Sequence, residues 1–257
     1  MLAATPYRGP TSVLRLPFSP RARLQIGLFL LAYLVYSAAR FVTIGDLPSA
    51  RDHAHWIMSA EQSLGIGVEA SVQAAFSGTW MLWVLNHLYL VAQLGVIPLA
   101  LIFLYRRAPE IYVRLRNTIL ATWLISVPVY GFFPVAPPRL ADIGIVDTIT
   151  SQTGVALDSS LTTSFYNELA AVPSLHVGFA VAVGFALFAA LRNPVLRVLA
   201  LLWGPVIGLA VVATGNHFVF DMIAGVVAAA LGYGLGAAAG RIRIRAKKPL
   251  GVTFAEA

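Results

Sequence analysis

Two short stretches of the sequence contain residues that could carry out chemistry at the edge of a membrane. Residues 171–176 read Ala-Val-Pro-Ser-Leu-His, and residues 214–221 read Thr-Gly-Asn-His-Phe-Val-Phe-Asp. Each histidine stands where a long apolar run begins, and a polar cluster is costly there unless it serves a function. In the second stretch His217 and Asp221 are four residues apart, so they share one face of a helix. The pair predicts an imidazole that is oriented by a carboxylate.

The composition sets the broad class of the protein. Hydrophobic residues make up 58% of the 257 residues and charged residues only 11%, and the mean hydropathy is +0.78. These values lie outside the balance of soluble domains and indicate an integral membrane protein. The sequence has no cysteine, which excludes disulfides, thiolate metal sites and cysteine nucleophiles.

Apolar runs of about 20 residues predict an all-α bundle of six membrane-spanning helices. The predicted spans are residues 24–43, 79–105, 117–135, 173–191, 195–214 and 216–239. The fifth and sixth spans adjoin, so we expect a tight helical hairpin that turns at Thr214-Gly215-Asn216. No internal repeat or second domain is evident, so one membrane domain, residues 24–240, lies between basic tails at 1–23 and 241–257.

The basic residues predict how this domain is oriented. Fifteen of the 18 fall in the two tails and in the connections after the second and fourth spans, all on one side. Arg40, Arg51 and Arg139 fall on the other side with most of the acids. The positive-inside rule then places both termini in the cytoplasm of a multi-pass plasma-membrane protein. The net charge of +7 therefore indicates topology and contact with anionic lipids rather than nucleic-acid binding. The first run is long enough to span and lacks a small-residue cleavage site, so we expect no cleavable signal peptide.

This topology brings three distant residues to one depth on the outer, extracytoplasmic face. His176 opens the fourth span, His217 opens the sixth, and Arg139 follows the third. A guanidinium supplies a planar fork for phosphoryl oxygens. The helix start at Ser174 offers free N–H groups for an anion, and Asn216 could cap the sixth helix. We therefore expect a phosphate-binding site there.

Two further segments lie on the outer side. Residues 46–78 have a pattern that suits helices lying in the membrane interface, with His53, His55, Glu61 and Glu69 solvated or interfacial. The 136–172 connection is longer than a plain linker and predicts a lid or binding loop. The polar residues of this connection considered for substrate binding are Asp142, Asp147, Asp158, Tyr166 and Glu168.

A further candidate for substrate binding, His87, lies in the second span near the outer face. Asn86, Tyr89 and Gln93 stand close to it in the sequence. A polar cluster that bridges helices is favoured over substrate binding for this group.

Three motifs resemble the signatures of the type 2 phosphatidic acid phosphatase superfamily. They are Ala-Pro-Pro-Arg at 136–139, Pro-Ser-Leu-His at 173–176, and Gly-Asn-His with an aspartate four residues on at 215–221. They look most like the membrane branch that includes inositol phosphorylceramide synthases, which are inositolphosphotransferases, and many actinobacterial proteins. The resemblance covers residues from about 80 to 240.

The resemblance implies a division of labour among the motif residues. His217 would attack phosphorus, Asp221 would hold its ring, and His176 would protonate the leaving oxygen. This implication agrees with the chemistry, because a neutral imidazole is nucleophilic near pH 7 and a second histidine can serve as general acid. The arrangement implies neither a metal nor another cofactor.

Departures from the superfamily pattern leave the acceptor open. A lysine and an arginine of the consensus are replaced by Phe132 and Val211, and Leu140 and Leu175 replace a proline and a glycine. A lipid phosphatase, which uses water, and an inositol-phosphate-type phosphotransferase, which uses a polyol or lipid hydroxyl, both fit. The substrate would be a lipid phosphate or phosphodiester.

Two other classes of protein remain as alternatives. A zinc-dependent hydrolase could use His176, His217 and Asp221, which are acceptable ligand types. A non-enzymatic transporter could use the same residues as a proton relay.

Overall fold

The chain, in a computed structural model, is described for residues 19–42, 45–157, 159 and 167–246. Asp158 and Tyr166 lie outside the described residues, as do residues 1–18 and 247–257 of the two basic tails. The described part is helical and contains no strand, only one isolated bridge between Val135 and Ala170. The predicted all-α fold is therefore confirmed.

The helices follow the predicted spans closely and add short helices on one side. Their bounds are α1 Pro20–Val42, α2 Leu47–Leu64, α3 Glu69–Phe76, α4 Trp80–Val91, η1 Ala92–Val96, α5 Ile97–Arg107, α6 Pro109–Phe132, η2 Pro138–Leu140, α7 Thr148–Thr153, α9 Leu175–Ala190, α10 Pro194–Ala213 and α11 Val219–Ala246. The π-helical turn η1 joins α4 to α5, so the second predicted span is one continuous helix with a bulge.

Three of these helical stretches are long and apolar enough to cross a membrane, which is consistent with a membrane protein. Within the described residues they are Trp80–Arg107, Pro194–Ala213 and Val219–Ala238, and Ala22–Ala38 and Leu175–Ala190 are shorter apolar helices. Helix α6 is not among them. Its buried face carries Thr118, Thr122 and Ser126, whose hydroxyls each donate to the carbonyl four residues earlier.

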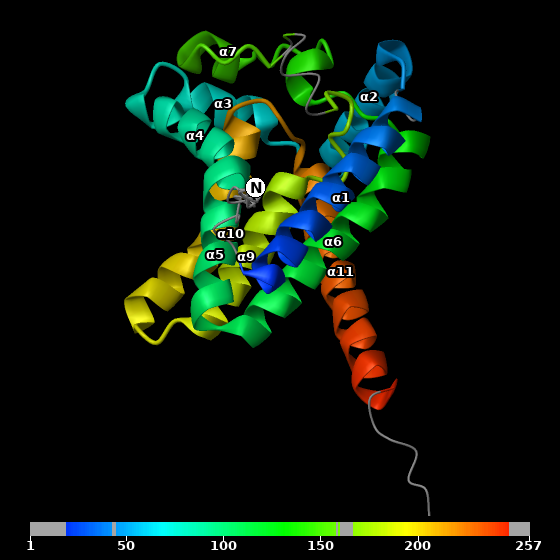
Figure 1. Cartoon of the computed structure of the whole chain (residues 1–257). Coiled ribbons are helices and arrows are strands. Elements are labelled where there is room, and N and C mark those ends of the chain that lie inside the picture. The colour runs from blue at the N-terminus through cyan, green and yellow to red at the C-terminus, as the bar shows by residue number, and fades with distance from the viewer. Residues whose placement is uncertain (1–18, 43–44, 158, 160–166, 247–257) are drawn as a thin grey trace, which may run out of the picture.

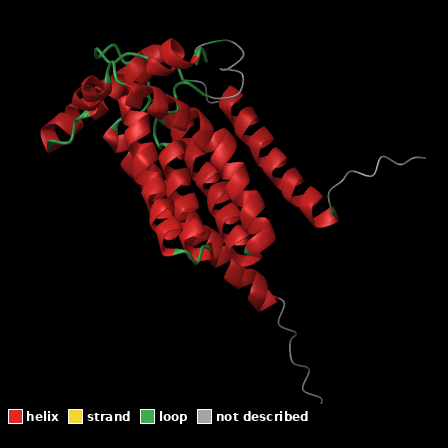
Figure 2. Cartoon of the chain, turned by 90° about the vertical axis from the view of Figure 1, so that its left-hand side faces the viewer, coloured by secondary structure: helices red, strands yellow, loops and turns green. Residues whose placement is uncertain are grey.

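Helix α9 lies at the centre of the bundle. It packs against α10, α11, α6 and α5, and these helices surround it in Figure 1. Helix α1 stands at the edge of the bundle (Figure 2) and contacts α6, where the rings of Tyr36 and Trp123 stack with centroids 6.4 Å apart.

The predicted hairpin of the last two helices is wrong in one respect. The connection between α10 and α11 is short, as expected, and spans residues 214–218. The two helices, however, do not pack along one another. Helix α10 packs mainly on α9 and α4, whereas α11 packs mainly on α6 and α9. The reason is that α9 lies between them and offers small residues to both.

Glycines permit this close packing around α9. A Cβ added at Gly178 would meet the Gly225 carbonyl of α11, and one added at Gly184 would meet the Ala200 carbonyl of α10. A Cβ added at Gly225 would overlap the backbone of Ser174, at the start of α9. Small residues at such crossings let helix backbones approach. The approach of Gly225 to Ser174 fixes the start of α9 against α11.

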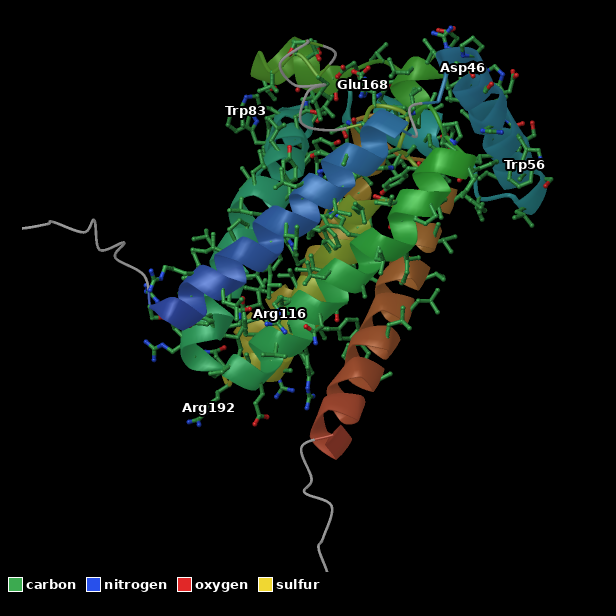
Figure 3. The ribbon with its side chains drawn as sticks, turned by 45° about the vertical axis from the view of Figure 1, so that its right-hand side comes forward. Asp46, Trp56, Trp83, Arg116, Glu168 and Arg192 are labelled. Carbon is green, nitrogen blue, oxygen red and sulfur yellow. The ribbon has the colours of Figure 1, made fainter. Side chains whose placement is uncertain are left out.

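Acidic and basic residues labelled in Figure 3 lie at opposite ends of the bundle. In Figure 3, Asp46 and Glu168 lie at one end with α2 and α7, and Arg116 and Arg192 lie at the other. The sequence predicts this division.

Replacing Gly225 with Ala should lower the unfolding temperature of the detergent-solubilised protein. The added methyl group overlaps the Ser174 backbone, and overpacking a tight interface costs about 1–3 kcal/mol. Gly234, also in α11, has no atom within 4 Å of an added Cβ, so Gly234→Ala is the matched control and should leave stability unchanged or slightly raised. Equal unfolding temperatures for the two variants would contradict the proposed close contact.

Candidate active site

His217 lies in the turn that leads from α10 into α11. Gly215 adopts a φ of +72° in this turn, a conformation that favours glycine. The His217 Nδ1 lies 3.2 Å from Oδ2 of Asp221, which also accepts a hydrogen bond of 2.9 Å from the Phe218 N–H. Asp221 is fully buried. The structure therefore contains the carboxylate-oriented imidazole that the sequence predicts.

The environment of His217 keeps its imidazole neutral. Burial lowers the pKa of His217 to about 3, the nearby cation of Arg139 acts in the same direction, and a contact with the Ala171 backbone opposes them. A neutral imidazole whose Nδ1 faces a carboxylate can carry its proton on Nδ1 and leave the Nε2 lone pair available.

His176 is the second residue of α9 and faces His217. Ser174 caps the helix, and its Oγ accepts a hydrogen bond from the Val177 N–H. The His176 ring stacks on Tyr89 of α4, with centroids 4.1 Å apart and planes inclined by 18°. The centroids of the His176 and His217 rings are 6.1 Å apart. The stacking fixes the orientation of the second histidine toward the first.

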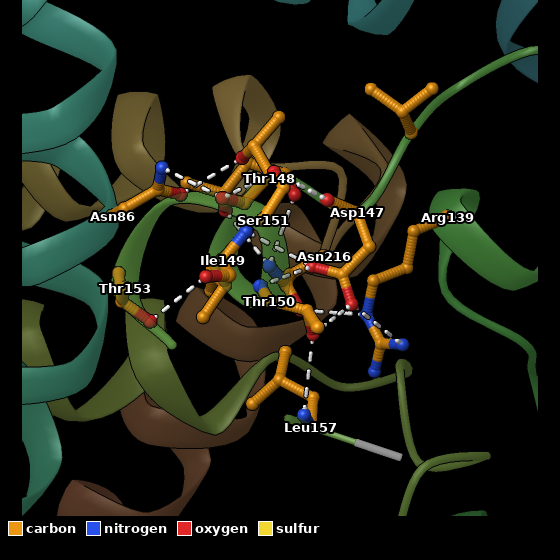
Figure 4. Close-up of polar contacts among 12 residues, drawn as sticks. Asn86, Arg139, Asp147, Thr148, Ile149, Thr150, Ser151, Thr153, Leu157 and Asn216 are labelled. Atoms are coloured by element: carbon orange, nitrogen blue, oxygen red, sulfur yellow. Dashed lines mark hydrogen bonds and ion pairs between the residues drawn. The ribbon is translucent and has the colours of Figure 1, made fainter. Parts of the chain in front are cut away.

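Arg139 is held near His217 by contacts with the same turn. Its backbone N–H donates to the Gly215 carbonyl at 2.9 Å, and its Nε donates to Asn216 Oδ1 at 3.1 Å. The guanidinium Nη1 lies 3.8 Å from Asp147 Oδ2, and the Arg139 side chain is only 2% exposed. Figure 4 shows the guanidinium of Arg139 directed toward Asp147 and Asn216. A buried guanidinium that is aimed in this way can bind an anion.

Helix α2 fastens the loop that carries Arg139. The Arg51 Nε donates to the Leu140 carbonyl at 2.8 Å, and the Ala136 N–H donates to the Ala50 carbonyl at 3.0 Å. His53 and His55 lie 2.7 and 2.8 Å from the carbonyls of Pro134 and Ala141. Both histidines therefore satisfy carbonyls of this loop, while His53 is only partly buried and His55 is exposed, which agrees with the expectation that they are solvated or interfacial.

Glu61 and Glu69 are buried, which corrects the expectation that these two acids are solvated or interfacial. Their exposed fractions are 1% and 6%. The Phe220 N–H donates to Glu61 Oε1, and the Val219 N–H donates to Glu69 Oε1 at 2.9 Å. The two carboxyl groups thus cap the first turn of α11 instead of facing solvent. Asn216, which the sequence suggests as a cap for this helix, bonds to Arg139 and Thr214 instead.

The predicted residues converge on one cavity of about 90 Å³, a volume that holds several water molecules. Arg139, His176, Asn216 and His217 all line it, although 37 and 41 residues separate Arg139, His176 and His217 along the chain. The remaining lining residues are Tyr36, Tyr89, Gln93, Tyr130, Pro137, Asn167, Glu168, Ala170, Ala171 and Leu175.

Five predicted residues do not line this cavity, and one of them is Asp221, which contacts His217 from outside the lining. Ser174 is buried and its N–H donates to the Asp221 carbonyl at 3.0 Å. Asp142 pairs with Arg51 at 2.9 Å. Asp147 caps α7 and approaches Arg139 from outside the cavity. The ring of His87 lies against Trp83, with centroids 3.9 Å apart.

The proposed polar cluster around His87 divides between two places. Asn86 bridges α4 to α7 through Thr148, with hydrogen bonds of 2.8 and 3.1 Å. Tyr89 and Gln93 line the cavity instead.

The sequence reasoning missed several cavity residues. Tyr36 comes from α1, and the hydroxyl of Tyr130 donates to the Pro173 carbonyl at 2.9 Å. No motif marks these residues, since tyrosines near a membrane edge are common. For Glu61 a signal was present. It continues the buried stripe of Ala50, Ala54 and Ile57 on α2 at spacings of four, three and four.

The geometry offers no obvious metal centre. Among the residues that the structure describes, no group of three or more His, Asp or Glu side chains is arranged to hold an ion. Asp221 Oδ2 is already used by His217 and Phe218. The arrangement suits an anion that is bound by Arg139 in the cavity that both imidazoles line.

The comparison with protein families accounts for the three motifs. The family model described as the PAP2 superfamily matches residues 55–235, which include all three. No curated protein and no solved structure matches the chain. Members of this family are phosphatases, which makes phosphatase or phosphotransferase activity on phosphate esters plausible here. The matched segment covers well over half of the sequence, so the chain belongs to the PAP2 superfamily.

Proposed function

We propose that the protein transfers a phosphoryl group from a lipid phosphate or phosphodiester by way of a covalent intermediate on His217. The observation that carries this proposal is the convergence of Arg139, His176 and His217 on one cavity. This chemistry needs three groups, which are a neutral nucleophile oriented by a carboxylate, a second imidazole and a guanidinium.

The reaction proceeds in two displacements. The Nε2 of His217 attacks phosphorus while the bond to the leaving oxygen breaks, and protonated His176 gives its proton to that oxygen. Water or an acceptor hydroxyl then attacks the phosphohistidine, gives its proton to His176, and the P–N bond breaks. Arg139 stabilises the charge on the equatorial oxygens.

The charges around the cavity favour a phosphodiester over a phosphate monoester. Among the described residues Arg139 is the sole arginine or lysine that lines it, and Glu168 lines it too. The sequence lacks two cations of the superfamily consensus. Of the residues that replace them, Val211 is packed in the core and Phe132 is 90% exposed. A singly charged diester needs less compensating positive charge than a doubly charged monoester, so transfer to an alcohol is favoured over release of free phosphate.

The site lies at the membrane surface in this proposal. Six spans, with both termini in the cytoplasm of a plasma-membrane protein, place the cavity at the outer leaflet. The separation of Arg116 and Arg192 from the end that carries Glu168 supports this orientation (Figure 3). Exposed apolar residues on α2, including Trp56 and Leu64, suit contact with the interface. Single cysteines placed near residues 52 and 192 test the orientation in intact cells. A thiol reagent that does not cross the membrane should label the first and not the second.

The alternatives make different predictions for the purified protein. A zinc hydrolase would lose turnover in chelator, and a transporter would give no chemical turnover in detergent. The decisive assay presents phospholipids and polyprenyl phosphates, with and without polyols, and identifies the lipid products by mass spectrometry. A new phosphodiester lipid supports transfer, and free phosphate supports hydrolysis.

Replacing His217 with Ala should abolish turnover and the acid-labile phosphoprotein that rapid quenching with radiolabelled substrate captures. Asp221→Asn keeps the shape of the side chain but loses the charge that orients the imidazole. By analogy with other oriented histidines we expect its kcat to fall on the order of 10⁴-fold. A His217→Ala protein that keeps most of its activity would rule out this nucleophile.

Glu168→Gln should change the preference among acceptors or head groups, because this carboxylate lines the cavity from the long connection and can bind hydroxyl groups. Asp142→Asn, on the same connection, is the control. Asp142 is exposed and paired with Arg51, so its variant should keep wild-type preference. Measuring kcat/KM for a panel of acceptors separates the two variants, and identical panels would remove Glu168 from recognition.

A further inference from the structure

The start of α11 depends on carboxyl groups that no motif includes. A helix leaves its first N–H groups without partners inside the helix. In α11 the N–H groups of Val219 and Phe220 donate to Glu69 and Glu61, which are 150 and 159 residues away along the chain. The Phe218 N–H donates to Asp221. Side chains from α2 and α3 therefore hold the first turn of the helix that follows His217.

The two glutamates lie where an ionised pair is costly. Glu61 is 1% exposed and Glu69 6%, and their side chains interact directly. Burial, the direct contact with Glu69 and the charges of Glu69 and Asp221 raise the pKa of Glu61 to about 8, although the Phe220 N–H opposes the shift. The Oε2 atom of Glu61 is buried and accepts no hydrogen bond. One proton shared by the pair removes a buried charge and lets this oxygen take part in a hydrogen bond.

We propose that Glu61 and Glu69 are positioning residues, a proton-sharing carboxyl pair that fixes the first turn of α11 and thereby the aim of His217. His217 stands only two residues before Val219, so a shift of the turn moves the imidazole relative to Arg139 and His176. This inference rests on the proposed role of His217 as nucleophile. Neither glutamate touches the cavity, so both act through the helix start and not on the substrate.

The pair makes the site sensitive to alkaline pH. The titratable groups that face Glu61 are Glu69 from α3 and Asp221 from α11. The folded state keeps the proton on Glu61 up to about pH 8, whereas the ordinary pKa is 4.5. The stability that this group contributes is therefore complete below pH 4.5 and is lost as the pH rises through about 8. Above that pH, Glu61 becomes a buried anion behind the first turn, and we expect the turn to loosen.

Glu61→Gln distinguishes positioning from simple packing. The amide keeps the oxygen that accepts from Phe220, and its NH₂ group can donate to Glu69 in place of the shared proton. We expect kcat near that of the wild type at pH 6–7. The loss of activity and of thermal stability that the wild type shows as the pH rises through about 8 should be absent in this variant. Asp52→Asn, at an exposed position of the same helix, should keep the wild-type pH profile.

Glu61→Ala removes the hydrogen bond to the helix start. We expect kcat to fall about 10²-fold, because a misplacement of about 1 Å has an effect of that size, while KM stays within about twofold. Hydrogen exchange of the peptide that covers residues 217–224 should be faster in Glu61→Ala than in the wild type or in Glu61→Gln. This exchange measurement does not require turnover and so tests the pair even in an inactive protein.

The outcomes separate this inference from the proposed function. In one outcome the wild type turns over substrate in a His217-dependent way, but Glu61→Gln still loses activity and thermal stability as the pH rises through about 8. That outcome overturns the carboxyl pair and leaves the proposed function standing. Unchanged exchange at 217–224 in Glu61→Ala overturns it as well. A wild type without His217-dependent turnover overturns the proposed function, and the exchange result then decides whether the pair holds the helix start.

Discussion

The N–H groups at the start of α11, which have no backbone acceptor within the helix, are the constraint on which the rest of the site depends. The bond of the Phe218 N–H is buried and those of Val219 and Phe220 are partly buried, and protein side chains satisfy all three. Asp221 accepts from Phe218, Glu69 from Val219 and Glu61 from Phe220. The cap therefore requires α2 and α3 to fold against α11, and these two short helices become part of the site without lining the cavity.

The other two motifs are attached to the same turn by backbone hydrogen bonds. The Arg139 N–H donates to the Gly215 carbonyl, and the Ser174 N–H donates to the Asp221 carbonyl. Asp221 thus orients His217 through its side chain and holds the start of α9 through its backbone. Because Gly225 has no side chain, α11 approaches Ser174 closely enough for that bond. The relative positions of the guanidinium and the two imidazoles follow from these backbone contacts.

The sequence predicts the helices, the division of charge and the four site residues of the motifs that line the cavity, because apolar runs and short motifs are local signals. It does not predict that α10 and α11 diverge, since this depends on the small residues that α9 offers to both. For Glu61 and Glu69 the sequence predicts a solvated or interfacial position, because acids outside a span are usually exposed. The distant N–H groups of α11 make their burial tolerable. The spacing of Glu61 with the buried residues Ala50, Ala54 and Ile57 indicates that Glu61 is buried, but nothing in the sequence of α2 or α3 indicates the pairing with α11.

The acids around the site explain how one guanidinium can serve it. Asp147 lies 3.8 Å from Arg139, too long for a close ion pair, so an incoming phosphoryl group can replace it as the partner of the guanidinium without a large loss. A shared proton on the Glu61 and Glu69 pair would reduce the negative charge behind His217. The neutral state of His217 avoids adding a charge that the substrate would have to neutralise. Among the described residues, a site with one lining cation and nearby acids can therefore accept an anion of low charge, and for the proposed reaction this electrostatic balance favours a phosphodiester more strongly than any single contact does.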